Sequence, residues 1–330
     1  MKSHEVAIQV RVSGKESFKE NVKILVTGAL GHIGSALIRD PALVSEASEL
    51  VLIDNLTTQR FPSVFELPAG VKYTLLPFDV ESVMTIALAG ECDAVIHLAA
   101  ISDPAASVAN PQWLYDNNLR ITQHVVRTCL SSQTPLVFVS TTSVYTSDTG
   151  KVDEQSPTDN PTTPYARCKL EEESLVLEAM ANGLAGVIYR LGTIFGISPG
   201  MRFHTAVNKF CWQAAIGQMI EVWRTALDQR RPYLDLNDAR VVLARTVLER
   251  LYPGEIVNAV TCDVTVAEVL QIIQDCGIET RIRLVDSPVM NDLSYTTSTA
   301  RALGHGLRFQ GSLDAQIRST LQMLGHLGPR

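Results

Sequence analysis

The sequence predicts an α/β fold in which parallel strands form a doubly wound sheet and a smaller α/β lobe follows. A short apolar run ends in a glycine-rich turn, and a second apolar run ends in an aspartate about 20 residues later. A Ser/Thr-rich strand end precedes a Tyr-x-x-x-Lys pair by about 20 residues. Short apolar runs bounded by turn residues are typical of strands buried on both faces, as in parallel sheets covered by helices.

The first predicted strand, at residues 22–26, leads into a turn that contains Gly28, Gly31 and Gly34. Glycine is needed where a turn is tight, where backbone approaches a pyrophosphate, and where a helix packs close to the sheet. A helix at residues 35–39 would offer its free N–H groups and positive dipole end to that pyrophosphate. The spacing is Gly-x-x-Gly-x-x-Gly rather than the commoner Gly-x-Gly-x-x-Gly, and an ordinary strand-to-helix turn is the alternative.

The second predicted strand, at residues 50–53, ends in Asp54. An acidic residue at this distance from the glycines accepts hydrogen bonds from the adenosine ribose hydroxyls. Its charge repels a 2′-phosphate, so Asp54 favours NAD over NADP. Arg60 is close in sequence and could soften that preference, and a solvated aspartate at a strand end is the alternative.

Two further segments fit the same sheet. Residues 74–77 lead to Asp79, which could hydrogen-bond the adenine amine. Residues 94–100 form an apolar run that ends in Ala99 and Ala100, whose small side chains let the backbone pass close to a cofactor. His97 lies within this run, where a lone histidine is more often a packed, hydrogen-bonded core group than a ligand.

The candidate catalytic residues follow the strand predicted at residues 135–139. That strand opens into a hydroxyl-rich end at residues 140–145, where a hydroxyl can bind a substrate oxygen, although Ser and Thr also cap turns. Tyr165 and Lys169 lie four residues apart, so on a helix they project from the same face. A neighbouring ammonium stabilises phenolate, and we therefore expect Lys169 to lower the pKa of Tyr165 towards working pH. Such a tyrosine can take a proton from an alcohol while hydride leaves the carbon.

Together these residues resemble the NAD-dependent epimerase/dehydratase family of extended short-chain dehydrogenases/reductases. The resemblance is strong over the first 200 residues and thin afterwards. The matching stretches are residues 27–34, 53–56, 97–100, 115–118, 140–145 and 165–169. Residues 231–235 resemble an Arg-x-Tyr/Phe motif of that family.

The resemblance implies a Rossmann-type fold and roles for individual residues. Tyr165 would be the general base and acid, Lys169 would orient the ribose, and Thr141 would take the place of the catalytic Ser/Thr. The implied cofactor is NAD, held by Gly28, Leu30, Gly31, His32, Ile33, Gly34, Asp54, Asn55, Asp79, Val80, Leu98, Ala99, Ala100, Asn118, Tyr165 and Lys169. The implied substrate is a nucleotide sugar.

The substrate side is less well defined by sequence. Arg231 would contact the nucleotide diphosphate, as the family arginine does, and Thr142 and Thr193 occupy substrate-facing positions of the family. Arg202 and Asn208 lie in and after a predicted loop and could face the sugar or its phosphates. A solvated arginine and a helix-surface amide are the alternatives for these two.

Departures from the family narrow the predicted reaction. Thr142 and Ser143 stand where dehydratases carry an Asp-Glu pair, and neither can act as a carboxylic acid, so we expect no dehydration. Thr193 replaces the usual substrate-binding asparagine. Because an epimerase returns the hydride that it borrows, NAD suffices for it, and Asp54 therefore favours a nucleotide-sugar epimerase. An NAD(P)-dependent keto-sugar reductase or dehydrogenase and a non-catalytic NAD-sensing regulator are the alternatives.

The whole chain sets outer bounds. Its 330 residues carry a net charge of −7, which disfavours nucleic-acid and anionic-membrane binding. The six cysteines are scattered without a Cys-x-x-Cys or His pairing, so we expect reduced thiols, no metal site and a cytoplasmic protein. No apolar run reaches membrane-spanning length.

We expect three parts along the chain. Residues 1–21 would be a mobile N-terminal extension, residues 22–190 the NAD-binding Rossmann domain, and residues 191–330 mainly the substrate-binding lobe, with some segments returning to the sheet. Helices are predicted at residues 112–130, 165–180, 203–216, 264–276 and 313–324. The resemblance implies that the first two of these helices form a four-helix bundle in a homodimer; burial within one chain is the alternative.

Overall fold

The computed structural model describes residues 8–10, 22–102, 110–146, 150–286, 293–325 and 327. The strands are β1 (Ile8–Val10), β2 (Lys23–Thr27), β3 (Glu49–Ile53), β4 (Lys72–Leu76), β5 (Ala94–His97), β6 (Leu136–Thr141), β7 (Gly150–Val152), β8 (Gly186–Leu191), β9 (Thr193–Phe195), β10 (Met219–Trp223), β11 (Arg231–Asp235), β12 (Ile256–Ala259), β13 (Cys262–Val264), β14 (Arg281–Val285) and β15 (Tyr295–Thr297).

The α-helices are α1 (His32–Leu37), α2 (Pro41–Glu46), α3 (Val80–Val83), α4 (Ile86–Gly90), α6 (Pro111–Ser132), α7 (Pro164–Ala181), α8 (Ala206–Ala215), α9 (Leu236–Leu248), α10 (Val266–Asp275), α11 (Ala300–Gly304) and α12 (Leu313–Leu324). Short 3-10 turns are η1 (Phe61–Val64), η2 (Thr142–Val144) and η3 (Arg224–Ala226). Every predicted strand of the first 140 residues is present, within three residues of its expected ends. Helix α1 begins at His32 rather than at Ser35, because Gly31 already has the extended conformation of an N-cap.

One large sheet organises the molecule, with strand order β1-β4-β3-β2-β5-β6-β8-β12. The pairings from β4 to β12 are all parallel, which confirms the predicted doubly wound α/β fold. Strand β1 is the exception and pairs antiparallel with β4. Within the expected N-terminal extension, the backbone of Ile8–Val10 pairs with the edge of β4, and the rest of residues 1–21 lies outside the described residues.

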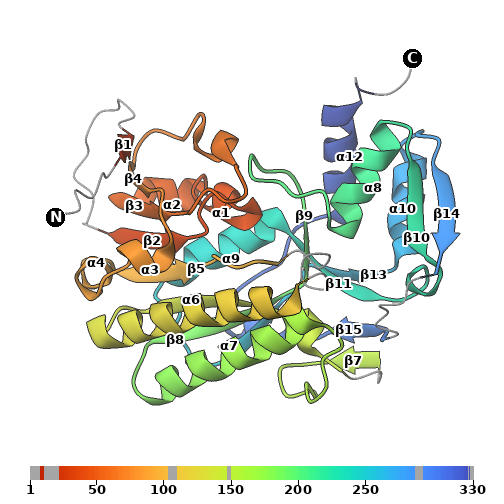
Figure 1. Cartoon of the computed structure of the whole chain (residues 1–330). Coiled ribbons are helices and arrows are strands. Elements are labelled where there is room, and N and C mark those ends of the chain that lie inside the picture. The colour runs from red at the N-terminus through yellow and green to blue at the C-terminus, as the bar shows by residue number, and fades with distance from the viewer. Residues whose placement is uncertain are drawn as a thin grey trace.

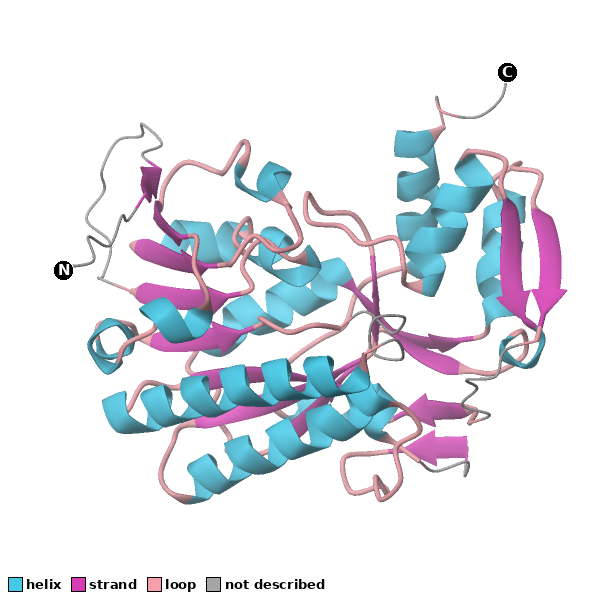
Figure 2. Ribbon diagram, viewed as in Figure 1, coloured by secondary structure: helices cyan, strands magenta, loops and turns pink. Residues whose placement is uncertain are grey.

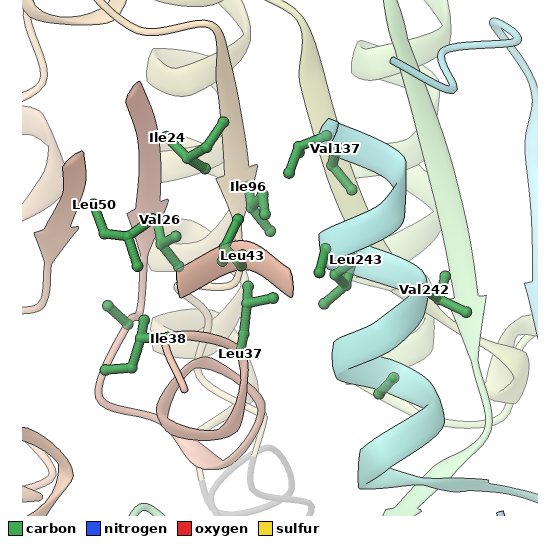
Figure 3. Close-up of a cluster of buried hydrophobic side chains, with 14 of the residues drawn as sticks. Ile24, Val26, Leu37, Ile38, Leu43, Leu50, Ile96, Val137, Val242 and Leu243 are labelled. Carbon is green, nitrogen blue, oxygen red and sulfur yellow. The ribbon is translucent and has the colours of Figure 1, made fainter. Parts of the chain in front are cut away.

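Two hydrophobic layers cover the two faces of this sheet. Ile24 and Val26 of β2 join one core cluster with residues of α1, α2 and α9. Leu25, between them, joins a second cluster with residues of α6 and α7. Successive strand residues point to opposite faces, so one strand supplies both cores. Figure 3 shows the first cluster, with Leu243 of α9 among its members.

A smaller lobe lies beyond the carboxyl ends of the strands, on the right in Figure 2. It contains α8, α10 and α12 around a third core cluster, beside the two-stranded parallel sheet β10-β14. Strands β13, β11 and β9 form a separate small sheet. The chain then returns, because β12 pairs with β8 and α9 packs on α1.

The helices expected in this part of the chain are present. Helix α12 has the predicted bounds, whereas α8 and α10 are shorter than predicted at both ends. Helix α10 begins at a capping box made by Thr265 and Glu268, which satisfies two backbone donors at the helix start. Among the described residues, we find no helix with the length and apolar character needed to cross a membrane.

The core between α9 and the sheet supports a stability prediction. Leu243 is 0% exposed, and we expect Leu243→Ala to lower the free energy of unfolding by about 2–5 kcal/mol, since it leaves a cavity. Leu303 of α11 is 44% exposed and serves as the matched control, with an expected change within about 0.5 kcal/mol. Chemical denaturation measures both, and equal costs for the two variants would contradict the assignment of Leu243 to the core.

Candidate active site

The glycine-rich turn after β2 is sterically closed to larger residues. Gly28 has a φ of +65°, and a Cβ atom on it would lie 2.6 Å from the backbone nitrogen of Ala99. A Cβ atom on Gly34 would lie 2.5 Å from the carbonyl oxygen of Ala29. Glycine therefore permits both the close approach of the turn to the loop after β5 and the close packing of α1.

Asp54 lies at the end of β3 and is hydrogen-bonded to this turn. One carboxylate oxygen accepts from the backbone N–H of Leu30 at 3.0 Å, and the other accepts from that of Leu56 at 3.0 Å. Next to it, the amide of Asn55 donates to Asp79 at 2.8 Å. The structure thus brings together the residues predicted to bind the adenosine half of the cofactor, with Asp54 half-buried and Asn55 and Asp79 exposed.

The loop after β5 is held in place from two sides. The backbone N–H of Ala99 donates to the hydroxyl of Thr27 at 3.3 Å. Asn118 of α6 is 1% exposed, and its amide accepts from the N–H of Ile101 at 2.8 Å and donates to the carbonyl of Ile101 at 2.9 Å. Asn118, predicted to bind the cofactor, here supports the backbone that lies beside the glycine turn.

His32 also has a structural role. Its ring is 3% exposed, and Nε2 is hydrogen-bonded to the carbonyl of Gly196 at 2.9 Å. Burial lowers the pKa of His32 to about 4, so the imidazole is neutral near pH 7. We therefore expect His32 to contact the cofactor through its backbone and not through its side chain.

The loop that contains Gly200 packs directly on the glycine turn, a contact that the sequence did not predict. Ser35 and Ser198 are joined through their hydroxyls at 2.9 Å, and the N–H of Gly200 donates to Ser35 at 3.0 Å. A Cβ atom on Gly200 would lie 2.5 Å from the carbonyl oxygen of Gly31. The Arg60 guanidinium, which we considered as a group that could soften the preference for NAD, donates to the carbonyls of Gly200 and Met201.

Tyr165 and Lys169 lie in the first turns of α7, which begins where the Thr163 hydroxyl accepts the N–H of Ala166 at 3.1 Å. The Lys169 Nζ atom is 6.0 Å from the centre of the Tyr165 ring and 4.8 Å from that of Phe138. Lys169 is 4% exposed and Tyr165 is half-buried. An ammonium and a phenol therefore share one protected place near the end of β6.

The pKa of Tyr165 differs in direction from our expectation. Burial raises it above its ordinary value, and the charges of Lys169 and Arg202 oppose this rise without overcoming it. Burial is the largest cause of this rise; the Glu172 carboxylate, which lies 3.1 Å from Lys169 Nζ, adds to it and raises the pKa of Tyr165 further. Lys169 thus has the expected lowering effect on the pKa of Tyr165, but burial outweighs it and the net direction is upward.

The hydroxyls at the end of β6 point in different directions. Thr141 is half-buried, and its hydroxyl oxygen accepts from the N–H of Ser143 at 3.1 Å. Thr142 is 2% exposed, and its hydroxyl donates to the carbonyl of Leu191 at 3.2 Å. This bond gives Thr142 a structural role, and the expected substrate contacts of Thr141 and Thr142 stay predictions.

Arg202 and Asn208 were both predicted to face the substrate, and the structure joins them to each other. Arg202 donates to the hydroxyl of Ser102 at 2.5 Å and is close enough to Tyr165 to act on its pKa. Asn208 is 1% exposed, accepts from the N–H of Gly196 at 3.2 Å and donates to the carbonyl of Arg202 at 3.0 Å. Asn208 therefore holds the loop that carries Arg202 and is not the surface amide that we considered.

The remaining predicted substrate residues lie on the small sheet. The Arg231 guanidinium carbon is 5.7 Å from the centre of the Tyr295 ring, and the Tyr295 hydroxyl donates to the carbonyl of Thr142 at 2.9 Å. Thr193 is exposed on β9. Arg230 is paired with Glu268 at 2.8 Å and so belongs to the charged surface.

The residues at this edge of the sheet fit a dinucleotide. The glycine turn leaves backbone close to the loop after β5, and the Asp54 carboxylate stands at the end of the neighbouring strand. His97, in contrast, is a core group as predicted: it is 3% exposed and hydrogen-bonded to Thr27 at 2.7 Å. The chemistry that fits this arrangement is hydride transfer beside a proton-transferring tyrosine.

Comparison with known proteins agrees with this arrangement. The profile of the NAD dependent epimerase/dehydratase family matches residues 24–259. A UDP-glucose 4-epimerase of Streptomyces lividans is 31% identical over 185 residues, which are 54% of this chain and 54% of that protein. An uncharacterized UDP-glucose epimerase, YtcB of Bacillus subtilis (strain 168), is 34% identical over 206 residues, which are 58% of this chain and 63% of that protein. The matches thus span about half to two-thirds of the length of these relatives.

The fold also matches a solved structure. The UDP-glucose 4-epimerase of Thermus thermophilus, crystallised in complex with NAD, superposes with a TM-score of 0.77 at 22% identity. The alignment covers 92% of this chain and 99% of the other. At this identity the similarity supports the fold.

The closeness of Gly28 to Ala99 gives a binding prediction. We expect Gly28→Ala to weaken NAD binding about tenfold or more, because the methyl group forces the turn away from the loop after β5. Gly254 also has positive φ (+73°) but nothing lies within 4 Å of its Cβ position, so Gly254→Ala controls for backbone strain alone. Calorimetric titration with NAD measures both, and equal affinities would contradict a cofactor site at Gly28.

Proposed function

Because the chain belongs to the NAD dependent epimerase/dehydratase family, we propose that it is an NAD-dependent epimerase of a nucleotide-activated sugar. The observation that carries the proposal is the protected pair of Tyr165 and Lys169 at the edge of the sheet that also carries the glycine turn. The family's description names NAD, which is also the cofactor that we predicted from Asp54. The names of the matched relatives support a nucleotide sugar as the substrate class.

In the proposed reaction, Tyr165 removes the proton of the sugar C4 hydroxyl and later returns a proton to the same oxygen. Bound NAD would supply the acceptor for a hydride from that carbon and, after the keto sugar has rotated, the donor of a hydride to its opposite face, so that the carbon is inverted. Thr141 offers a hydroxyl to the substrate oxygen, and Lys169 would hold the ribose of the cofactor. Because Tyr165 acts first as a base, turnover should rise with pH through its raised pKa.

The anionic part of the substrate is assigned to the arginines. Arg231 and Arg202 approach the site from different elements, and guanidinium groups bind diphosphate oxygens through paired hydrogen bonds. We propose that residues 22–190 mainly bind NAD and that residues 191–330 mainly bind the substrate. A local positive charge of this kind outweighs the net charge of −7.

A keto-sugar reductase of the same family is the second candidate. The Tyr165 phenol beside Lys169 can equally donate the proton that reduction of a ketone needs. Dehydration is not proposed, because Thr142 and Ser143 carry no carboxylate. A purely NAD-sensing role does not account for the Tyr165–Lys169 pair.

A panel of nucleotide sugars distinguishes the two candidates. The epimerase proposal predicts conversion of one sugar to its C4 epimer with no net release or consumption of NADH, because the hydride returns to the substrate. Chromatography of the products together with NADH absorbance gives both quantities. Consumption of one NADH for each sugar would contradict the epimerase proposal and support the reductase.

The same assay tests the role of the tyrosine. Tyr165→Phe should reduce turnover about 10²–10⁴-fold, the usual contribution of a general base, while NAD affinity stays within a factor of two or three. Normal turnover in this variant would refute the assignment of Tyr165.

We also propose a homodimer formed through α6 and α7, which run side by side in front of the sheet (Figure 1). Trp113 of α6 and Leu177 of α7 are 49% and 37% exposed, large apolar surface that a partner copy would cover. Analytical ultracentrifugation should show a dimer that Leu177→Glu shifts towards monomer. Leu303→Glu, at a 44% exposed site on α11, should leave it intact, and a monomeric native protein would overturn the proposal.

A further inference from the structure

Glu172 is a buried carboxylate that the proposed mechanism does not use. It lies one turn after Lys169 on α7, is 0% exposed, and approaches Lys169 Nζ to 3.1 Å. A carboxylate away from water is costly unless it is paired and hydrogen-bonded. Because burial of this carboxylate is costly, we expect Glu172 to have a function beside the Lys169 ammonium.

The second partner of Glu172 comes from a different helix. Thr122 of α6 is 0% exposed, and its hydroxyl donates to Glu172 at 2.5 Å. Because this hydroxyl donates to the carboxylate, its oxygen accepts from His97 Nε2 at 3.3 Å. His97 Nδ1 then accepts from the Thr27 hydroxyl at 2.7 Å. Thr27 thus donates to His97, His97 to Thr122 and Thr122 to Glu172, so these hydrogen bonds between β2 and α7 all run in the same direction.

The charges that act on Tyr165 can be named element by element. On α7 they are Lys169 and Glu172, and from the loop before α8 it is Arg202. Cys168 also lies on α7, but burial raises the pKa of its thiol to about 12, so it is neutral. His97 on β5 is neutral as well, because burial, and then the charge of Lys169, lower its pKa to about 3.

Among the described residues, strand β8 adds Arg190, whose charge is paired with Glu173 of α7 at 2.7 Å, and the groups of β6 and α6 in contact with Lys169 and Glu172 are uncharged. Strand β6 contributes the apolar ring of Phe138 beneath Lys169 Nζ. Helix α6 contributes Thr122, while its Tyr115 is hydrogen-bonded to the exposed carboxylate of Glu171. Glu172 is thus the carboxylate that faces the Tyr165–Lys169 pair.

We propose that Glu172 is a positioning residue of the catalytic site, which fixes the Lys169 ammonium between α6 and α7 and offsets part of its charge at Tyr165. The proposal rests on the proposed function only in taking Tyr165 as the proton-transferring group. It deepens that function, because Glu172 then sets the pH range in which Tyr165 acts as a base.

The sign of the effect follows from the charges. Replacing Glu172 with glutamine removes a negative charge beside Lys169, so the phenolate of Tyr165 becomes more favourable relative to the phenol. The first proton of the coupled Tyr165–Lys169 pair is then lost at lower pH. The acid limb of the pH–activity profile should shift in the same direction, since a base is active when deprotonated.

The test is a pH titration of the NAD-loaded full-length protein. The phenolate absorbance of Tyr165 is obtained as the difference between each protein and its Tyr165→Phe counterpart. We expect Glu172→Gln to move the midpoint down by about one pH unit, a roughly tenfold change in proton affinity. Glu171→Gln, which removes the neighbouring exposed carboxylate, is the matched control and should move it by less than about 0.3 unit.

A second variant guards against a folding defect in the first. Glu172→Asp keeps the charge but moves it away from Lys169, so its midpoint should lie between those of the native protein and Glu172→Gln. An unchanged or higher midpoint in both variants would overturn the proposal. The titration uses no sugar, so absence of epimerisation would refute the proposed function without affecting this result, and an unshifted midpoint in an active epimerase would refute this proposal alone.

Discussion

The parallel pairing of β2 with β3 and β5, and of β5 with β6, is the constraint on which the site depends. Parallel strands end at the same edge, so residues far apart in sequence meet there. Gly28, Asp54, Ala99 and Thr141 each stand at the carboxyl end of one of these strands or in the turn behind it. Helix α7 adds Tyr165 and Lys169, together with the Glu172 carboxylate that pairs with Lys169.

Burial at this edge makes electrostatics decisive. Two consecutive glutamates of α7 each pair with a buried cation: Glu172 with Lys169 at 3.1 Å, and Glu173 with Arg190 at 2.7 Å. Glu173 also accepts from the hydroxyl of Ser140 at 2.5 Å, which ties α7 to β6 behind the site. The same low-dielectric surroundings that raise the pKa of Tyr165 make its neighbours' charges effective, so small changes in pairing have large consequences for proton transfer.

The parts of the site that the sequence predicted are those carried by short local patterns. The glycine turn, Asp54 and the Tyr165–Lys169 spacing each lie within a stretch of a few residues. The contact of His32 with Gly196 joins residues 164 positions apart, and no local pattern marks it. Residues 171–173 are three consecutive glutamates, a run typical of a solvated helix face, and only tertiary packing shows that two of them are buried.

The central claim is that the phenol of Tyr165 exchanges a proton with the sugar. A crystal structure with NAD and an unreactive nucleotide-sugar analogue tests this claim most directly. The account predicts the Tyr165 hydroxyl within hydrogen-bonding distance of the C4 oxygen, with Lys169 Nζ still in contact with Glu172. A phenol turned away from the sugar, with another side chain in its place, would contradict it.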